Sequence, residues 1–424
     1  KVRELEGRLS SLRLERFSAF QTWLEQSSED DAWLPVGVGR FQFESMESGV
    51  VANEANKAKP GKVGDSPQLV SGFGAGKAIQ FDGEDWAKFP GVADFDRHQP
   101  FSMAFWLRIP EAYDRAVVLH RSMAWTDAGS RGYELLIEDG ELSFALVHFW
   151  PGNAIRVRTH DSFPIDQWAH VGLTYDGSSR ASGMKVYVNG HAMPVDVVRD
   201  QLTRTIRGGG ADALTLAQRF RDRGLKGGSI DDLRVFDVEL TSYEVESLVQ
   251  KEMPPPSKAE GIAIYLRDID ESYRAQAAEL VVARRALGKQ RDLQTEIMVM
   301  RDMATQRATY VRPRGSYLMK GDRVDPGTPA CLPPLSKTPR NRLALAQWLL
   351  DPAHPLTARV AVNRIWQMYF GTGLVASAED FGSQGSSPTH PKLLDWLARM
   401  FMDSGWDMKA LHRLIATSAT FRQS

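Results

Sequence analysis

The segment from Gln167 to Asn189 constrains the fold of this chain most, because it has the pattern of two β-strands joined by a turn. Each run alternates apolar with other residues, at Val171, Leu173, Val186 and Val188. A polar spacer separates the runs, and Asn189-Gly190 has the composition of a tight hairpin turn. Alternating strands of this length are typical of antiparallel sheets with one buried face, so the segment predicts a β-sandwich.

Further strand-like runs precede and follow this segment at the spacing of a two-sheet sandwich. They span Lys77 to Phe81, Phe101 to Ile109, Ala116 to His120, Tyr133 to Ile137, Leu142 to Phe149, Ala154 to Thr159 and Leu214 to Ala217. The stretch from Gly227 to Val245 predicts a last strand that runs into a short helix. Three consecutive prolines beginning at Pro254 then stiffen the exit from the sandwich.

Amphipathic helices are predicted on both sides of this β-region. Residues 1 to about 27 carry leucines at three- and four-residue spacing, and residues 259 to 304 repeat that spacing. Each helix has an apolar stripe, and the sequence offers neither of them another obvious partner. We therefore expect an antiparallel coiled-coil hairpin with the sandwich inserted between its two arms.

The C-terminal part changes composition twice. A Pro- and Gly-rich connector is followed by four helical segments, of which one begins at Pro391 and others are followed by Gly371 and Gly405. The expected organisation has five parts: a first helical arm (1–30), a β-sandwich (31–250), a linker with the second arm (251–310), the connector (311–340) and a truncated, mostly α-helical domain (341–424). Both ends fall inside predicted helices, as expected for a fragment.

Bulk composition removes several classes of function. The 52 Lys and Arg residues almost balance the 53 Asp and Glu residues, which leaves no electrostatic reason to expect nucleic acid as a partner. The single cysteine, Cys331, cannot form an intramolecular disulfide, a zinc cluster or a c-type haem attachment. No apolar run approaches the roughly 18 residues that a membrane-spanning helix needs.

Four stretches of the β-region resemble laminin-G-like domains, which share the jelly-roll fold of concanavalin A. They are KAIQFDG from Lys77, FSMAFWLRIP from Phe101, QWAHVGLTYDG from Gln167 and SIDDLRVFD from Ser229. The resemblance implies a module that binds glycans or protein surfaces and that only sometimes catalyses. Function must therefore be argued from a site and not from the fold.

Residues 341 to 424 closely resemble the domain of unknown function found in planctomycetal cytochrome-associated proteins, and residues 314 to 335 are similar to its connecting segment. In such proteins an exported N-terminal part with c-type haem motifs comes first, and a laminin-G-like module is often inserted. The resemblance implies an exported protein, periplasmic or at the cell surface. Haem chemistry would belong to residues outside this chain.

A catalytic site is not expected. A glucanase of this fold class needs two carboxylates about 5 Å apart, and the nearest candidates are Glu134, Glu138 and Glu141. Because Glu138-Asp139-Gly140 has the composition of a turn, these residues are interpreted as solvated hairpin carboxylates. The common hydrolase, zinc-protease and phosphate-loop motifs do not occur in the sequence.

Three aspartates are candidates for a calcium site at a sheet edge. Asp231 and Asp232 precede the last strand, and Asp82 lies in the FDG turn. Calcium takes six to eight oxygen ligands, so these carboxylates would need backbone carbonyls beside them. In the alternative interpretation, one aspartate accepts backbone hydrogen bonds and fixes the last strand to the turn at Asp82-Gly83.

Two tryptophans in predicted loops are candidates for glycan binding. Trp125 lies near Asp127, and Trp150 lies near Asn153, so each indole would have a polar hydrogen-bonding group beside it. The alternative for both tryptophans is core packing, since the chain has 11 Trp residues and many must be buried.

The leading hypothesis is non-catalytic binding of a polysaccharide or another cell-envelope glycan by the sandwich. One alternative is a part of a haem-linked oxidoreductase or a glycan-degrading enzyme whose active parts lie partly outside this chain. Another is a protein-protein scaffold built on the helical arms, which predicts an exposed apolar stripe after the arms pair.

Overall fold

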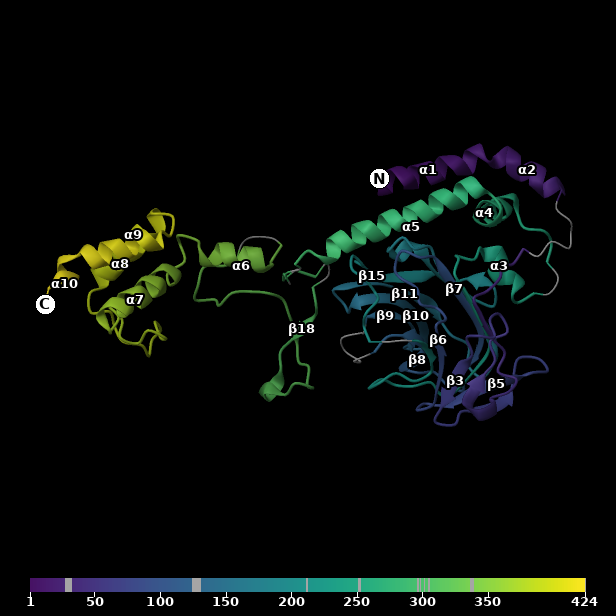
Figure 1. The fold of residues 1–424 in the computed structure, drawn as a ribbon. Coiled ribbons are helices and arrows are strands. Elements are labelled where there is room, and N and C mark those ends of the chain that lie inside the picture. Colours follow the sequence, from purple (N-terminus) through teal and green to yellow (C-terminus); the bar gives the residue numbers. More distant parts are fainter. Residues whose placement is uncertain are drawn as a thin grey trace. The chain divides into compact units, whose positions relative to one another are not determined.

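A computed structural model describes residues 1–26, 33–123, 131–210, 213–250, 253–295, 297, 299–300, 302–303, 306–335 and 339–423. The chain divides into two compact units, residues 1–296 and 297–424, and each is considered by itself. The first unit holds the sandwich and the helical arms, and the second holds the C-terminal helices (Figure 1).

Within the described residues, the sandwich consists of two antiparallel sheets. The eight-stranded sheet has the order β14 (His191–Ala192), β13 (Met184–Val188), β12 (Ala169–Tyr175), β7 (Phe101–Arg108), β17 (Lys226–Phe236), β5 (Lys77–Asp82) and β4 (Gln68–Ser71), with β1 (Gly39–Phe41) also paired to β17. The nine-stranded sheet has the order β15 (Val195–Asp200), β11 (Asn153–Ser162), β10 (Glu141–Phe149), β9 (Gly132–Glu138), β8 (Arg115–Arg121), β16 (Ala213–Leu216), β6 (Trp86–Pro90), β3 (Gly61–Gly64) and β2 (Val50–Val51). Short 3-10 turns occur at η1 (Glu47–Gly49) and η2 (Ala181–Gly183).

The hairpin predicted from Gln167 to Asn189 is confirmed as β12 and β13. Val171 pairs with Val188 and Leu173 with Val186, and the side chains of these residues lie in or against the core between the two sheets. Side chains alternate across a strand, so every second residue of each strand points to an outer face instead. Those two outer faces are the surfaces on which a site can be built.

Part of the outer face of the eight-stranded sheet is covered by helix α3 (Ser242–Ser247). Thr241 and Glu244 form a capping box that starts this helix. Val245 and Leu240 pack against Tyr187 of β13, whose side chain is fully buried. This cover explains why strands of that sheet are buried on both faces.

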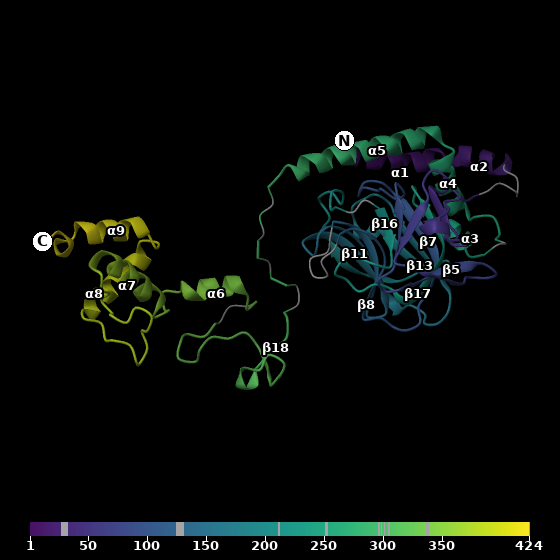
Figure 2. The ribbon, with the colours of Figure 1, turned by 60° about the horizontal axis from the view of Figure 1, so that its bottom comes forward.

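The helical arms each break at one point, and the two breaks face each other. The first arm is α1 (Val2–Glu15) and α2 (Phe17–Gln26), and the second is α4 (Lys258–Asp268) and α5 (Glu271–Asp292). Arg16, between α1 and α2, lies 3.3 Å from the Asp270 carboxylate, which caps the N-terminus of α5. Helix α1 lies beside α5, and α2 packs on α4 around the buried Phe20 (Figure 2).

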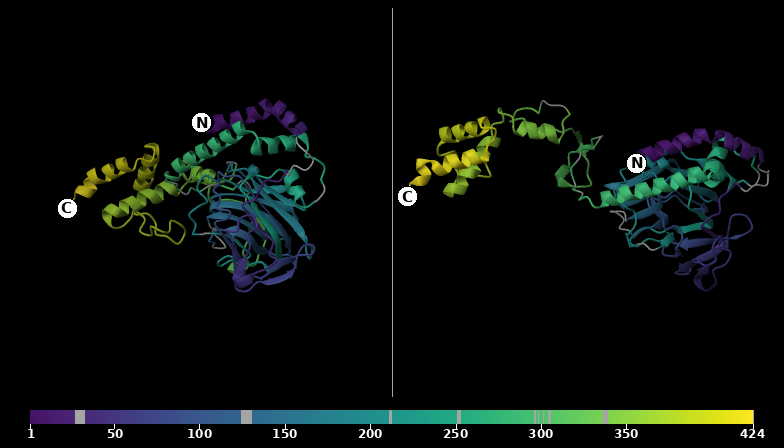
Figure 3. Two further views of the ribbon diagram at one scale, coloured as in Figure 1. Left: turned by 45° about the vertical axis from the view of Figure 1, so that its right-hand side comes forward. Right: turned by 45° about the horizontal axis from the view of Figure 1, so that its top comes forward.

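The pairing of the arms therefore agrees with expectation, whereas coiled-coil packing stays a prediction. Two details differ from the sequence interpretation. The second arm is not one helix to residue 304, since α5 ends at Asp292. It also has a second partner, because α5 rests on the loops at one end of the sandwich (Figure 3).

Contacts between α5 and the sandwich are polar and close. Arg285 is 2.7 Å from Asp96, and Arg284 donates a 3.1 Å hydrogen bond to the carbonyl of Gly177. A Cβ atom at Gly288 would lie 2.8 Å from Nε2 of His98, so only glycine allows this approach. Helix α5 thus caps one end of the sandwich, while Arg267 of α4 forms an ion pair with Glu244 of α3.

The second unit begins with mostly irregular chain and ends in helices. It contains the short strands β18 (Thr309–Tyr310) and β19 (Arg323–Val324), the turn η3 (Pro313–Gly315), and α6 (Arg342–Leu349), α7 (Thr357–Phe370), α8 (Pro391–Asp403), α9 (Met408–Thr417) and α10 (Ala419–Arg422). Helices α7, α8 and α9 share a core that includes Val362, Leu397 and Leu411. Pro391 starts α8 and Gly371 ends α7 with a positive φ, as predicted.

The described helices include none that combines the length and the apolar character needed to cross a bilayer.

Candidate functional site

A continuous row of mostly polar side chains crosses the outer face of the nine-stranded sheet. Strand register aligns Lys88, Thr215, His120, Glu134, Ala145, Arg156 and Arg199 on seven neighbouring strands. Directly opposed residues share one face of a sheet, so the row gathers charges from parts of the sequence more than 100 residues apart.

Six charged residues at the centre of this face form a closed ring in which carboxylates and guanidiniums alternate. In order they are Glu134, Arg156, Glu138, Arg115, Asp222 and Arg219. Arg115 lies 2.7 Å from Glu138 and 2.8 Å from Asp222, and Arg156 lies 2.8 Å from Glu138. Glu134 contacts both Arg156 and Arg219. Two members, Arg219 and Asp222, come from the segment after β16, which folds over the sheet.

The interpretation of Glu134 as a solvated hairpin carboxylate was wrong. Glu134 and Glu138 stand four residues apart on one face of β9, and Glu134 is only 2% exposed. The turn begins after Glu138 and not before it, and the covering segment with Arg219 could not be placed from local pattern. This is the carboxylate spacing that a glucanase-like site would use, so the electrostatics decide what the pair can do.

The carboxylates of Glu134 and Glu138 both form ion pairs with arginine guanidiniums. Burial by itself would raise the pKa of Glu134, but Arg219 and Arg156 outweigh burial and the pKa is lowered. A general acid needs the opposite shift, toward neutral pH. The ring therefore supports a structural role for Glu134 and Glu138, which fixes the segment after β16 to the sheet.

Trp150 and Asn153, two of the residues predicted to bind glycans, lie at the edge of the same face. The Trp150 indole packs against Ala154 and neighbouring buried residues, and the Arg156 guanidinium is stacked 3.9 Å from its ring centroid. Asn153 is buried, and its side-chain oxygen accepts hydrogen bonds from the backbone N–H groups of Thr203 and Arg204. Asn153 thus makes internal hydrogen bonds, whereas Trp150 is partly buried on the outer face, and glycan binding by Trp150 stays a prediction. The other two predicted residues, Trp125 and Asp127, lie outside the described residues.

The structure does not bring the three candidate calcium ligands together. Lys226, and not Asp231, pairs with Asp82, and Ile230 pairs with Ile79, so the two aspartates are about four strand positions, or roughly 13 Å, apart along the sheet. Asp82 accepts hydrogen bonds from the backbone of Glu84 and Asp85 in its own turn, which lowers its pKa. No group of three potential metal-binding side chains occurs among the described residues. Calcium binding stays a prediction, which calorimetric titration of the protein with calcium would test.

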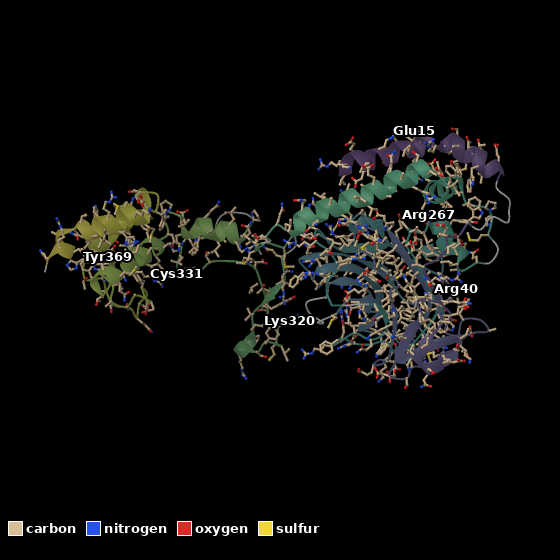
Figure 4. All side chains as sticks on the ribbon, in the orientation of Figure 1. Glu15, Arg40, Arg267, Lys320, Cys331 and Tyr369 are labelled. Atoms are coloured by element: carbon tan, nitrogen blue, oxygen red, sulfur yellow. The ribbon has the colours of Figure 1, made fainter. Side chains whose placement is uncertain are left out.

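Asp232 and Asp231 have different environments although they are neighbours. Asp232 forms ion pairs with Arg234 and with Arg40 of β1, the latter labelled in Figure 4. Burial alone would raise the pKa of Asp232, but these two arginines lower it. Asp231 forms no ion pair with any residue that the structure describes, and burial raises its pKa to about 6.

Asp231 holds a glycine-rich loop onto the outer face of the eight-stranded sheet. Its Oδ2 accepts a 2.9 Å hydrogen bond from the backbone N–H of Phe73, and its Oδ1 accepts one of 2.7 Å from Asp232. The alternative role foreseen for an aspartate here, acceptance of backbone hydrogen bonds, is therefore observed for Asp231. Its partner is the loop between β4 and β5 and not the turn at Asp82-Gly83.

Beside this loop lies a pocket of about 320 Å³ on the same outer face. Its polar lining comes from Ser71, Gln80, Arg108, Asp166 and Ser229. Arg108 and Asp166 are joined by a 2.6 Å ion pair at the rim, and Gln80 donates a 3.2 Å hydrogen bond to the Gly227 carbonyl. Next to the pocket, the ring of Phe73 is stacked on Trp106 with centroids 3.4 Å apart.

The residues of this pocket were not among those predicted from the sequence, although one strand of it has a recognisable pattern. In FSMAFWLRIP the alternation places Trp106 and Arg108 on the face opposite to Phe105 and Leu107, so a polar outer face on β7 could be read directly. Gln80 and Ser229 meet Arg108 only because β5, β17 and β7 are neighbours in the sheet. That adjacency joins segments about 150 residues apart and has no local signal.

Two family models match the chain at separate places. Residues 81–246 match the model described as the concanavalin A-like lectin/glucanases superfamily (Laminin_G_3). Residues 341–424 match PSD1, a protein of unknown function (DUF1553). Both resemblances drawn from the sequence are thereby confirmed. The chain thus combines a laminin-G-like sandwich with a C-terminal helical region of that family of unknown function.

Solved structures similar to the chain include toxin binding domains. The binding domain of Paraclostridial Mosquitocidal Protein 1 is 16% identical, with 51% of this chain and 52% of that chain covered and a TM-score of 0.40. The botulinum neurotoxin serotype G binding domain is 14% identical, with 50% of each chain covered and a TM-score of 0.38. This chain spans about half the length of these structures. None of the curated proteins matches it.

Proposed function

We propose that the sandwich is a non-catalytic ligand-binding module whose ligand is a polysaccharide or another cell-envelope glycan. The observation that carries this proposal is the 320 Å³ polar pocket, with the aromatic pair of Phe73 and Trp106 two residues along β7 from Arg108 of its lining. Its volume is at the lower end of the range for small-ligand sites, which suits one sugar unit of a longer chain.

The chemistry of the pocket matches sugar hydroxyl groups, which both donate and accept hydrogen bonds. Arg108 offers donors and Asp166 offers acceptors at the rim, and Ser229 and Gln80 supply groups of both kinds on the floor. An aromatic ring beside these groups provides a surface for the apolar face of a pyranose. The laminin-G-like fold is consistent with ligand binding but does not by itself select a glycan.

The carboxylate pair on the other sheet supports binding over hydrolysis. Glu134 and Glu138 have the spacing of a catalytic pair but are neutralised by Arg156 and its neighbours. Export to the periplasm or the cell surface belongs to this proposal, because envelope polysaccharide is found there.

The helical arms carry a second proposal, contact with a protein partner. Leu14 of α1 and Val282 of α5 are exposed after the arms pair. Sedimentation velocity at rising protein concentration would detect self-association through these side chains. A single sedimenting species at all concentrations would exclude self-association, and the proposed partner would then have to be a different protein.

The glycan proposal is tested with the full chain on an array of bacterial and plant polysaccharides. We expect retention of a defined glycan and at least a tenfold weaker affinity in the Arg108→Ala, Asp166→Ala double variant, since each lost charged hydrogen bond is worth about 1.5–3 kcal/mol. The matched control is Arg158→Ala, Glu141→Ala, which removes a similar 2.8 Å ion pair from the nine-stranded sheet.

Equal loss in both double variants would contradict binding at the pocket. Loss in Trp150→Ala, with the pocket variant unaffected, would move the site to the other sheet. A folded chain that retains no glycan would contradict the proposed function altogether.

A further inference from the structure

Phe73 covers a tryptophan that would otherwise lie open on the sheet. Trp106 of β7 is 8% exposed, and the Phe73 ring lies almost parallel to it, with an angle of 11° between the planes. Phe73 itself is 46% exposed, so its ring covers Trp106 from the solvent side and is not part of the core. The geometry is that of a flat ring laid on an indole.

The side chains around Trp106 include an unused hydrogen-bonding group. Strand register places His170, Trp106 and Asp231 in one row on β12, β7 and β17. His170 is 3% exposed, and its Nδ1 has no hydrogen-bond partner among the described residues. Buried polar atoms are nearly always paired in proteins, so an unpaired imidazole nitrogen next to an indole calls for a ligand or water.

The polar pocket continues this row along the strands. Arg108 is two residues beyond Trp106 on β7, and Ser229 is two residues before Asp231 on β17, so both share the same outer face. The stacked rings of Phe73 and Trp106 therefore lie on the outer face that carries the pocket, two residues along β7 from Arg108.

The loop that carries Phe73 has the composition of a movable element. Its sequence, GFGAG from Gly72 to Gly76, has three glycines in five residues, and Gly74 has a φ of +80°. A hydrogen bond from Gly72 to the Gly76 carbonyl closes the loop, and Asp231 holds the N–H of Phe73. Apart from these backbone contacts, the stacking on Trp106 is the ring contact that fixes the Phe73 side chain.

We propose that Phe73 is a lid that occupies a sugar subsite on Trp106 and is displaced by a pyranose ring of the bound glycan. The apolar face of the sugar stacks on the indole, and its hydroxyl groups bond to His170 Nδ1 and to the Asp231 oxygen that Phe73 releases. The chain of sugar units then continues into the pocket at Arg108. This inference rests on the proposed glycan function and names the second subsite of the same surface.

The first test measures Trp106 directly and needs no glycan. Hydroxyl-radical oxidation of the full chain, followed by peptide mass spectrometry, reports the solvent access of each tryptophan. We expect Trp106 to be protected in the wild type and oxidised at least fivefold faster in Phe73→Ala, with Trp86 on the other sheet unchanged. Continued protection of Trp106 in this variant would overturn the lid.

The second test uses the glycan that the wild type retains. Phe73→Ala is expected to bind it about tenfold more tightly, because no lid competes, while Phe73→Leu, which keeps an apolar cover, falls between the two. Trp106→Phe keeps an aromatic residue in β7, and unchanged near-ultraviolet circular dichroism would confirm its fold. We expect it to weaken binding about tenfold, because the smaller ring offers less stacking surface.

The outcomes separate the two proposals. Weaker binding by Phe73→Ala would make Phe73 a contact residue and overturn the lid, while the glycan function would stand. Absence of retention by both the wild type and Phe73→Ala would overturn the proposed function and the sugar subsite together, whatever the oxidation pattern of Trp106.

Discussion

Glu134 illustrates how strongly environment changes the role of one residue. Its carboxylate lies between Arg156 and Arg219 on a sheet face that the segment after β16 covers. Taking a carboxylate out of water is costly, and the two guanidiniums offset that cost only while both ion pairs are intact. The same side chain on an open sheet face would be an ordinary solvated acid.

Replacement of Glu134 by Ala is expected to lower the free energy of unfolding by about 3–5 kcal/mol, because two buried guanidiniums lose their shared partner. Urea denaturation measures this change. Arg158→Ala, which removes a half-exposed ion pair, should cost less than about 1 kcal/mol. Equal effects of the two substitutions would contradict the buried ring.

The pH dependence of the Glu134 contribution has a definite sign. Its pKa is lowered in the folded chain from 4.5, so the unfolded chain binds the proton more readily. The stabilisation is complete above about pH 4.5 and is lost as the pH falls toward the folded-state pKa. The difference in unfolding free energy between wild type and Glu134→Ala should therefore shrink on acidification.

At the scale of elements, the helical arms show how helix breaks are set by tertiary contacts. Each arm has one long apolar pattern, yet both are interrupted where Arg16 meets Asp270. Beyond the breaks, Phe20 of α2 inserts between Ile262 and Tyr265 of α4 and is fully buried. Phe17, one turn earlier, remains exposed.

This pair of phenylalanines gives a matched experiment on the docking of the arms. Phe20→Ala should cost about 3–5 kcal/mol of local stability, so the amide hydrogens of α1 and α2 exchange faster while those of the sandwich strands do not change. Phe17→Ala should alter exchange little. Faster exchange throughout the sandwich in Phe20→Ala would instead make the arms part of one cooperative unit with the sheets.

The whole chain consists of two units with separate cores. The sandwich core and the core of α7, α8 and α9 share no residues, and the described residues between 297 and 340 are mostly irregular, with two very short strands. A compact unit with its own core is expected to fold without the other. The family match at residues 341–424 coincides with the helices of the second unit.

Residues 341–424 expressed alone should therefore retain helical circular dichroism and unfold cooperatively, and residues 1–296 should melt as they do in the full chain. Limited proteolysis of the full chain should cut first within residues 297–340, where few buried contacts protect the backbone. A C-terminal fragment without helical structure would contradict the independence of the units.

Local sequence pattern sufficed for many of the elements, though not for the breaks in the helical arms. The alternation of Val171 and Leu173 against Val186 and Val188 predicted a hairpin that the structure contains, and Pro391 predicted the start of α8. These features depend on neighbours a few residues away, where backbone geometry and polarity act directly. The laminin-G-like identity of the sandwich could also be recognised, because strand order and turn residues follow one another along the chain.

Tertiary structure alone decided which side chains meet on the sheet faces. Glu134 contacts Arg219, which is 85 residues away in the sequence, and Phe73 donates a backbone hydrogen bond to Asp231, 158 residues away. Asn153 makes internal hydrogen bonds because residues 203 and 204 fold beside it. The order of strands in the sheets determines these contacts, and the sequence around each residue contains no local pattern that predicts them. Periodicity along the chain determined the hairpin and the helix-forming segments of this protein, whereas the helix breaks and the candidate site depend on contacts between distant segments.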